Sequence, residues 1–175
     1  MDRLRGRIAD PGRWLNDNFA GWQNLTPHEK KAIRDFPVLW SLFELRATGQ
    51  FGQRPNATPM RICNAVEELQ ADLDLEALQR TRNYFSDRYF QEGNPTNAFH
   101  QLRVPNDFQG RVRTALLEGN ADARAILLGL LLIVNRLRNN FLHGEKAAYA
   151  FADQLANFRH ANNVLMYAVP LWGEF

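Results

Sequence analysis

The chain has 175 residues, a formal net charge of +2 and a hydrophobic content of 45%. This length and composition predict one domain, residues 1–175, with a single sizeable core. Cys63 is the only cysteine, which excludes an intramolecular disulfide framework and a cysteine-rich zinc site. We therefore expect a protein of a reducing compartment, in the simplest case the cytoplasm, that needs no metal or other cofactor.

Arginine dominates the basic residues, since all but three of the 21 are arginine. Arginine suits bidentate contacts with phosphate or carboxylate, although a GC-rich genome gives the same bias. The composition therefore allows a nucleic-acid partner without requiring one. The most apolar run, residues 126–134, is much shorter than the roughly 20 residues that cross a bilayer, and the polar N-terminal segment lacks the apolar stretch of a secretory signal. We expect no membrane partner.

A proline-containing cap begins the first clear helix. Thr26-Pro27 followed by Glu29 forms a capping box with proline at the first helical position. We expect Pro37 to interrupt this helix and the apolar spacing to resume over residues 38–48.

Further caps and breaks divide the rest of the chain into helices and two long loops. The predicted helices span residues 59–73, 75–90, 106–118, 121–143 and 145–168, and the loops span residues 49–58 and 91–105. On the helix over residues 75–90, Arg80, Tyr84 and Arg88 recur every four residues and line one face, which we interpret as a solvated face. No segment alternates convincingly with period two. The sequence predicts an all-α bundle of five to seven helices without a sheet.

The end of the long apolar helix carries the one chemically suggestive segment. Asn135, Asn139 and His143 are four residues apart and should stack as a polar stripe. Arg138 lies about 60° from Asn135 but about 140° from His143 on a regular helix. The two side chains therefore meet only if the arginine stem reaches around the stripe, if the helix tightens before Gly144, or if two molecules come together.

A histidine and an arginine in one site suit the cleavage of RNA. Histidine can move a proton near neutral pH, while arginine can hold a phosphate and offset its developing charge. The 2′-hydroxyl of RNA is an internal nucleophile, so this chemistry needs no metal. The pairing alone has little specificity, because in this composition chance yields about one arginine with a histidine four to six residues later.

The other polar candidates have weaker support. His28, His100 and His160 are each more often structural or solvated than catalytic. Glu44 could orient Arg138 if their helices are neighbours, but its spacing from Ser41 and Thr48 is typical of a solvated face. We keep Asn135 and Glu44 as candidates for substrate binding or for positioning the arginine.

The context of the arginine carries more information than the spacing. Asn139 follows the arginine directly, Gly144 follows the histidine directly, and a long apolar helix leads into both. In these features the segment resembles the HEPN superfamily, in particular its Apea-like members, where Arg-Asn followed shortly by His-Gly closes a bundle helix. The resemblance covers residues 121–168 well, and the remainder only in its helical content and in the aromatic-rich helix over residues 36–45.

The resemblance implies a HEPN-like bundle and assigns Arg138, Asn139 and His143 to a catalytic motif that uses no metal. Active members are endoribonucleases that work as homodimers with two motifs in one cleft, so the stripes over residues 135–143 of two copies should face each other. Many members are toxins or act in antiviral defence, and an inhibitory protein partner is a further expectation.

Two features keep alternatives open. Other members of the superfamily have lost catalysis and bind RNA, a nucleotide or a partner protein through the same cleft, and the sequence does not separate the two cases. Toxins controlled by a nucleotidyltransferase antitoxin carry a tyrosine two places after the histidine, whereas this chain has Glu145 there. We therefore do not place the chain in that subgroup.

Overall fold

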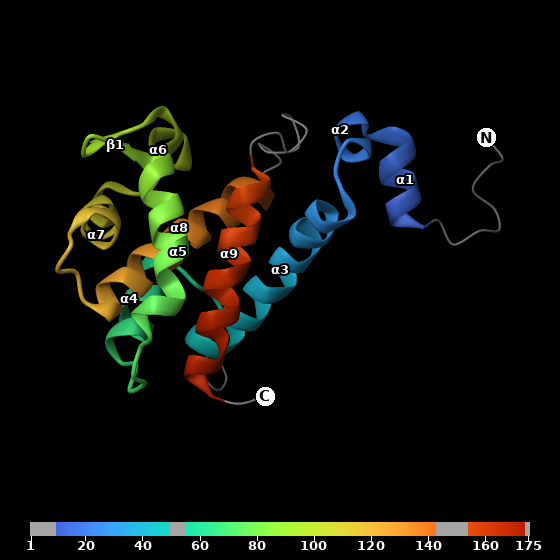
Figure 1. Ribbon diagram of the computed structural model, residues 1–175. Coiled ribbons are helices and arrows are strands. Elements are labelled where there is room, and N and C mark those ends of the chain that lie inside the picture. The colour runs from blue at the N-terminus through green and yellow to red at the C-terminus, as the bar shows by residue number, and fades with distance from the viewer. Residues whose placement is uncertain (1–9, 50–54, 143–153, 174–175) are drawn as a thin grey trace.

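The computed structural model describes residues 10–49, 55–142 and 154–173, which form an all-α bundle (Figure 1). The helices of these ranges are α1 (Pro11–Asn18), α2 (Ala20–Gln23), α3 (Pro27–Thr48), α4 (Pro59–Glu67), α5 (Leu75–Tyr89), α6 (Asn97–Leu102), α7 (Asn106–Leu117), α8 (Ala123–Leu142) and α9 (Leu155–Ala168), followed by the 3₁₀ helix η2 (Val169–Trp172). The predicted fold class is confirmed. The described ranges hold more than the expected five to seven helices because α1, α2 and α6 are short additional segments.

Helix α8 is the central element of the bundle. Twelve of its 20 residues are buried, and it packs against α4, α5, α6, α7 and α9. Asp122 caps its start by accepting the Ala125 N–H at 2.8 Å. By length and hydropathy α8 is also the one helix of the described ranges that could cross a membrane. Two thirds of its most apolar stretch is buried inside the protein, and length and hydropathy do not distinguish such a helix from an ordinary core helix.

Helices α7 and α8 approach each other closely at Gly129. A Cβ added at this position would overlap the Cβ of Ala115 on α7 and would stand 3.3 Å from the carbonyl oxygen of Arg111. Glycine is therefore required by the helix crossing and not by a turn.

Helix α3 corrects the prediction of a break at Pro37. The helix is continuous from Pro27 to Thr48, with Pro37 inside it. Phe36 and Trp40, one turn apart, are both buried in the core, and Asn162 of α9 donates to the Ala32 carbonyl at 2.9 Å. Tertiary packing on both sides of the proline thus outweighs the cost of a proline inside a helix, which is about 3 kcal/mol for the lost hydrogen bond and the ring clash together.

The predicted loop over residues 91–105 contains two small elements that the sequence did not indicate. The strands β1 (Phe90–Gln91) and β2 (Asn94–Pro95) pair antiparallel, and Glu92 and Gly93 both have positive φ, as a two-residue hairpin turn requires. Thr96 then caps α6 by accepting the Phe99 N–H.

Several predicted helix boundaries move. Helix α4 ends at Glu67 instead of residue 73, and α8 begins at Ala123 instead of residue 121. Helix α7 begins at residue 106 as predicted, but Asn106 is its first residue and Pro105, which gives no side-chain hydrogen bond, is its cap. The described part of the last helix starts at Leu155, and the predicted start over residues 145–153 lies outside the described residues. The buried apolar side chains of the described ranges form one cluster that extends from Trp22 to Val169.

The α7–α8 crossing yields a test of the fold. Gly129→Ala is expected to lower the free energy of unfolding by about 1–3 kcal/mol, because the added methyl overfills the contact with Ala115. Gly110→Ala, on the exposed face of α7 with nothing within 4 Å, is expected to raise it by about 0.5–1 kcal/mol. Urea denaturation measures both. Equal effects of the two substitutions would contradict the packing described here.

Candidate active site at the end of α8

The last two turns of α8 hold the described part of the predicted motif. Arg138 and Asn139 are half-buried there, and α8 ends at Leu142. His143, the third residue of the motif, lies outside the described residues, as do Gly144 and Glu145. The geometry of the site therefore concerns the arginine end of the motif.

Arg138 is held by neutral groups. Its guanidinium carbon lies 5.7 Å from the ring centre of Trp40 on α3, a cation–π contact, and its Nη1 donates to the Asn139 side-chain oxygen at 3.0 Å. No ion pair joins it to a carboxylate within the part of the chain that the structure describes. The guanidinium is thus oriented on one side, and no carboxylate of the described ranges neutralises its charge.

The two residues of this contact each carry a buried N–H donor. The Nε–H of Arg138 and the indole N–H of Trp40 are both shielded from solvent, and neither has a hydrogen-bond partner among residues 10–49, 55–142 and 154–173. Each such donor costs about 1–3 kcal/mol relative to a satisfied one. Folding alone does not favour this arrangement, and buried unsatisfied polar groups of this kind call for an explanation beyond packing.

Asn135 and Glu44 are both hydrogen-bonded to the backbone of the same residue, Ala57, and not to Arg138. Asn135 donates to the Ala57 carbonyl at 2.8 Å, and Glu44 accepts the Ala57 N–H at 2.9 Å. Side chains from α8 and α3 therefore satisfy both the carbonyl and the N–H of Ala57, the residue before the Thr58 cap of α4. Trp40 and Asn139, not Glu44, orient Arg138.

Burial changes the interpretation of both predicted faces. Asn135 is only 4% exposed, so it cannot belong to a surface that faces a second copy. Thr48 is buried, donates to the Glu44 carbonyl and accepts the Asn56 N–H. The prediction of a solvated face is therefore wrong for Glu44 and Thr48, and it holds for Ser41, which is exposed.

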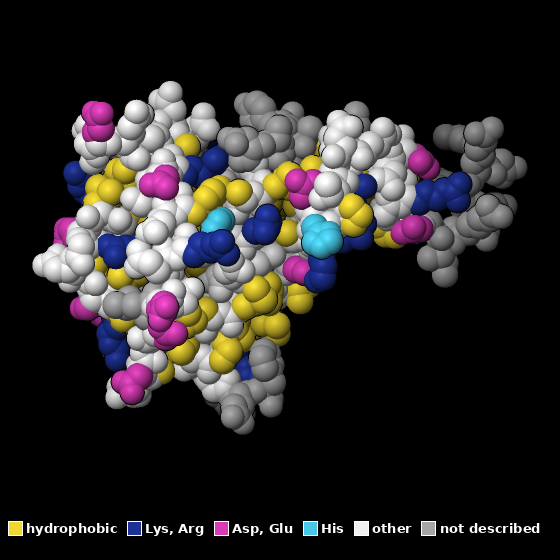
Figure 2. Space-filling model, viewed as in Figure 1, with side chains coloured by type: hydrophobic (Ala, Val, Ile, Leu, Met, Phe, Trp, Pro, Cys, Tyr) yellow, Lys and Arg dark blue, Asp and Glu magenta, His cyan; other side chains and the backbone are white. Residues whose placement is uncertain are grey.

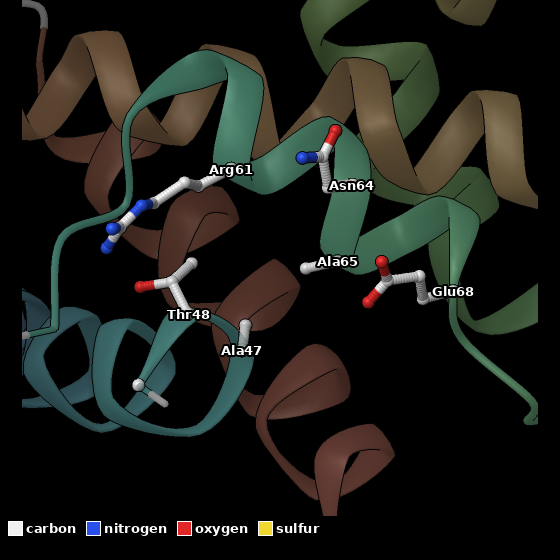
Figure 3. Close-up of a pocket in the computed structure, with 7 residues that line it drawn as sticks. Ala47, Thr48, Arg61, Asn64, Ala65 and Glu68 are labelled. Atoms are coloured by element: carbon white, nitrogen blue, oxygen red, sulfur yellow. The ribbon is translucent and has the colours of Figure 1, made fainter. Parts of the chain in front are cut away.

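A polar pocket of about 280 Å³ lies beside this network, between the end of α3 and α4 (Figure 3). Arg61 extends along the same side of the pocket as Thr48, and Glu68 lies at the opposite end. Its lining contains no histidine or cysteine. Within the described ranges no three residues of the types His, Cys, Asp and Glu gather as a metal site would require.

Asn140 is a polar residue of the motif region that the sequence analysis did not single out. It is 3% exposed and donates to the Gln101 carbonyl at 3.4 Å. With Arg88 of α5 and Asn157 of α9 it lines a cavity of about 10 Å³. Asn139 and Asn140 thus have different surroundings, because successive side chains of a helix point about 100° apart.

The remaining histidines of the chain stand apart from this site. His28 and His100 are exposed. His160 is half-buried on α9, where its Nδ1 and the Thr81 hydroxyl are hydrogen-bonded at 3.1 Å. Burial, and then the nearby Arg159 and Arg80, lower the pKa of His160. The thiol of Cys63 is buried, and its pKa is raised by that burial, which makes it a poor nucleophile.

Comparisons with protein-family models, with curated proteins and with solved structures find no match to this chain.

The shared hold on Ala57 yields a second test. Asn135→Ala and Glu44→Ala are each expected to lower the free energy of unfolding by about 1–3 kcal/mol, because each leaves a backbone group near α4 without its partner. The double variant should lose less than the sum, since both side chains hold the same residue. Thermal or urea denaturation gives all three values.

Two substitutions serve as controls for this test. Glu44→Gln keeps an oxygen that can accept the Ala57 N–H and should stay close to wild type. Asn163→Ala, at an exposed position of α9, should change the stability by less than about 0.5 kcal/mol. If Asn135→Ala is as mild as Asn163→Ala, Asn135 does not stabilise the α4 start.

Proposed function

We propose that this protein is a metal-independent endoribonuclease whose site is formed by Arg138, Asn139 and His143. The observation that supports this most is the surroundings of Arg138. It is a half-buried cation, oriented by Trp40 and Asn139, with no carboxylate to neutralise it in the described ranges. A guanidinium in this state is suited to the dianionic phosphorane that forms during RNA cleavage.

The reaction is an attack of the RNA 2′-hydroxyl on the adjacent phosphorus. A base removes the 2′-proton, the new O2′–P bond forms, and the P–O5′ bond breaks as the leaving oxygen takes up a proton. The products are a 2′,3′-cyclic phosphate and a 5′-hydroxyl. His143 moves the proton, Arg138 stabilises the charge on the non-bridging oxygens, and Asn139 holds the guanidinium in place.

A homodimer completes the proposed site. Arg138 and His143 are about 140° apart on a regular helix, so a two-fold axis near the end of α8 would let the arginine of one copy act with the histidine of the other. Leu142, 57% exposed at the end of α8, offers apolar surface to such a contact, whereas Asn135 does not take part. A role in a toxin system or in antiviral defence, with an inhibitory partner, belongs to the same proposal.

RNA cleavage tests the proposal directly. The wild-type protein is expected to cut RNA in EDTA, to leave 2′,3′-cyclic phosphate ends and to spare DNA of the same sequence. Arg138→Ala should lower the single-turnover rate about 100-fold or more, because one charge-stabilising donor is commonly worth that much. His143→Ala should lower it about 100-fold or more through lost proton transfer, and the double variant should be little worse.

Matched variants and mixtures separate the parts of this proposal. Arg13→Ala removes an exposed arginine of α1 and should cut like wild type. If each site draws residues from two copies, mixing Arg138→Ala with His143→Ala protomers should restore part of the activity, and sedimentation should show a dimer. If the wild type binds RNA but never cuts it, the endoribonuclease proposal fails and the protein is a non-catalytic RNA-binding module.

A further inference from the structure

Helices α5 and α9 lie side by side, and a row of polar and aromatic contacts fixes them to each other. The ring of Tyr84 stacks on His160 with centres 4.0 Å apart and planes 9° apart, and the Tyr84 hydroxyl donates to the Asn157 side chain at 2.9 Å. The Thr81 hydroxyl and His160 are hydrogen-bonded at the same interface. The surface around His160 is therefore rigid, because Tyr84 and Thr81 of α5 both hold its ring and Asn157 of α9 holds Tyr84.

Two arginines flank this histidine from different helices. Arg80 on α5 and Arg159 on α9 are both exposed, and both act on His160 electrostatically. On the face drawn in Figure 2, a histidine lies where α5 and α9 run side by side, with cationic side chains next to it. Helix α9 contains no acidic residue at all, so it adds only positive charge to this face.

Among the described residues no hydrogen bond or ion pair involves either arginine. Glu76 lies one turn before Arg80, but no ion pair joins Arg80 or Arg159 to a carboxylate in the described ranges. Arg82, two residues along α5, differs in this respect, since it donates to the carbonyls of Ala115 at 2.7 Å and Glu118 at 2.5 Å and so caps the end of α7. Exposed like charges on a fixed surface repel each other and favour binding of an anion.

This surface is connected to the end of α8. Arg88, two turns after Arg80 on the same face of α5, shares a small cavity with Asn157 of α9 and Asn140 of α8. Asn140 lies two residues after Arg138, about 200° further around α8, so the two side chains leave the helix on different sides. The α5–α9 face is thus continuous, through packed side chains, with the helix that carries the proposed catalytic arginine.

We propose that Arg80 and Arg159, on either side of His160, bind backbone phosphates of the RNA strand away from the scissile bond. The inference rests on the proposed function, because it takes RNA as the ligand. Arginine contributes charge and planar donors to the phosphate oxygens, and the contact is to the backbone, so it positions the strand without selecting a sequence. The stacked His160 and Tyr84 hold the surface in shape and do not stack on a base.

Salt-dependent binding tests this site independently of cleavage. Fluorescence anisotropy measures the affinity of the full chain for a single-stranded 2′-O-methyl RNA, which has no free 2′-hydroxyl to attack. Arg80→Gln and Arg159→Gln should each weaken binding about 3- to 10-fold at low salt. The double variant should flatten the slope of log affinity against log salt by about 1.4, which is about 0.7 for each lost phosphate contact on a single strand.

Controls distinguish a phosphate contact from an indirect effect on the fold. The doubly substituted Arg80→Lys, Arg159→Lys protein keeps both charges and should keep most of the salt slope. Arg13→Gln loses one exposed positive charge on the distant helix α1 and should bind RNA nearly as wild type does. A double glutamine variant with wild-type affinity and slope would overturn the inference, and so would a wild type that does not bind this RNA at low salt.

The result separates this site from the proposed activity. If the wild type binds RNA through Arg80 and Arg159 but leaves cleavable RNA intact, the inference stands and the endoribonuclease proposal fails. If the wild type cuts RNA and the double glutamine variant binds and cuts equally well, the activity stands and the inference fails. In that second case Arg80 and Arg159 do not bind RNA, and a phosphorylated ligand of another class is the next one to test.

Discussion

The burial of α8 is the interaction on which the rest of the structure depends. Nine consecutive residues, 126–134, are buried, and helices from both halves of the chain pack around them. A helix buried on all sides cannot rotate or slide without opening the core, since protein interiors are close-packed. The position of its last turns relative to α3 is therefore fixed, and Arg138 and Trp40 meet for that reason.

The polar side chains of the bundle divide into two kinds. Asn135, Asn162 and Arg82 satisfy backbone groups of neighbouring segments, and their contacts join helices to each other. Arg138, Arg80 and Arg159 pair with no carboxylate among the residues that the structure describes. In a chain with so many arginines, this difference in partners distinguishes structural arginines from those available to an anionic ligand, and composition alone does not.

Local signals in the sequence predicted much of the fold. The capping box at Thr26 and the cap-plus-proline signal at Thr58-Pro59 place the starts of α3 and α4 correctly, because a cap acts over three or four residues. The continuity of α3 through Pro37 and the turn at Glu92 depend on packing partners far along the chain or on backbone conformations that the residue types do not specify. At both places the local signals alone give the wrong structure.

The candidate site shows the same division. The spacing of Arg138, Asn139 and Asn135 on one helix follows from the sequence, but the sequence does not say which of them is covered by another helix. The bond from Asn135 to Ala57 spans 78 positions, and the contact of Arg138 with Trp40 joins helices that are distant in sequence. Trp40 lies in the aromatic-rich helix predicted over residues 36–45, and nothing local in the sequence connects an aromatic residue to a cation so far away.

The central claim is that Arg138, held against Trp40, binds the phosphate of RNA. The most direct measurement is the ¹H–¹⁵N resonances of the Arg138 Nε and the Trp40 indole during titration with 2′-O-methyl RNA. We predict that both shift and saturate together, while the indole of Trp14, 57% exposed on α1, does not move. If RNA binds and the Arg138 and Trp40 resonances stay in place, the phosphate binds elsewhere and the account of this site is wrong.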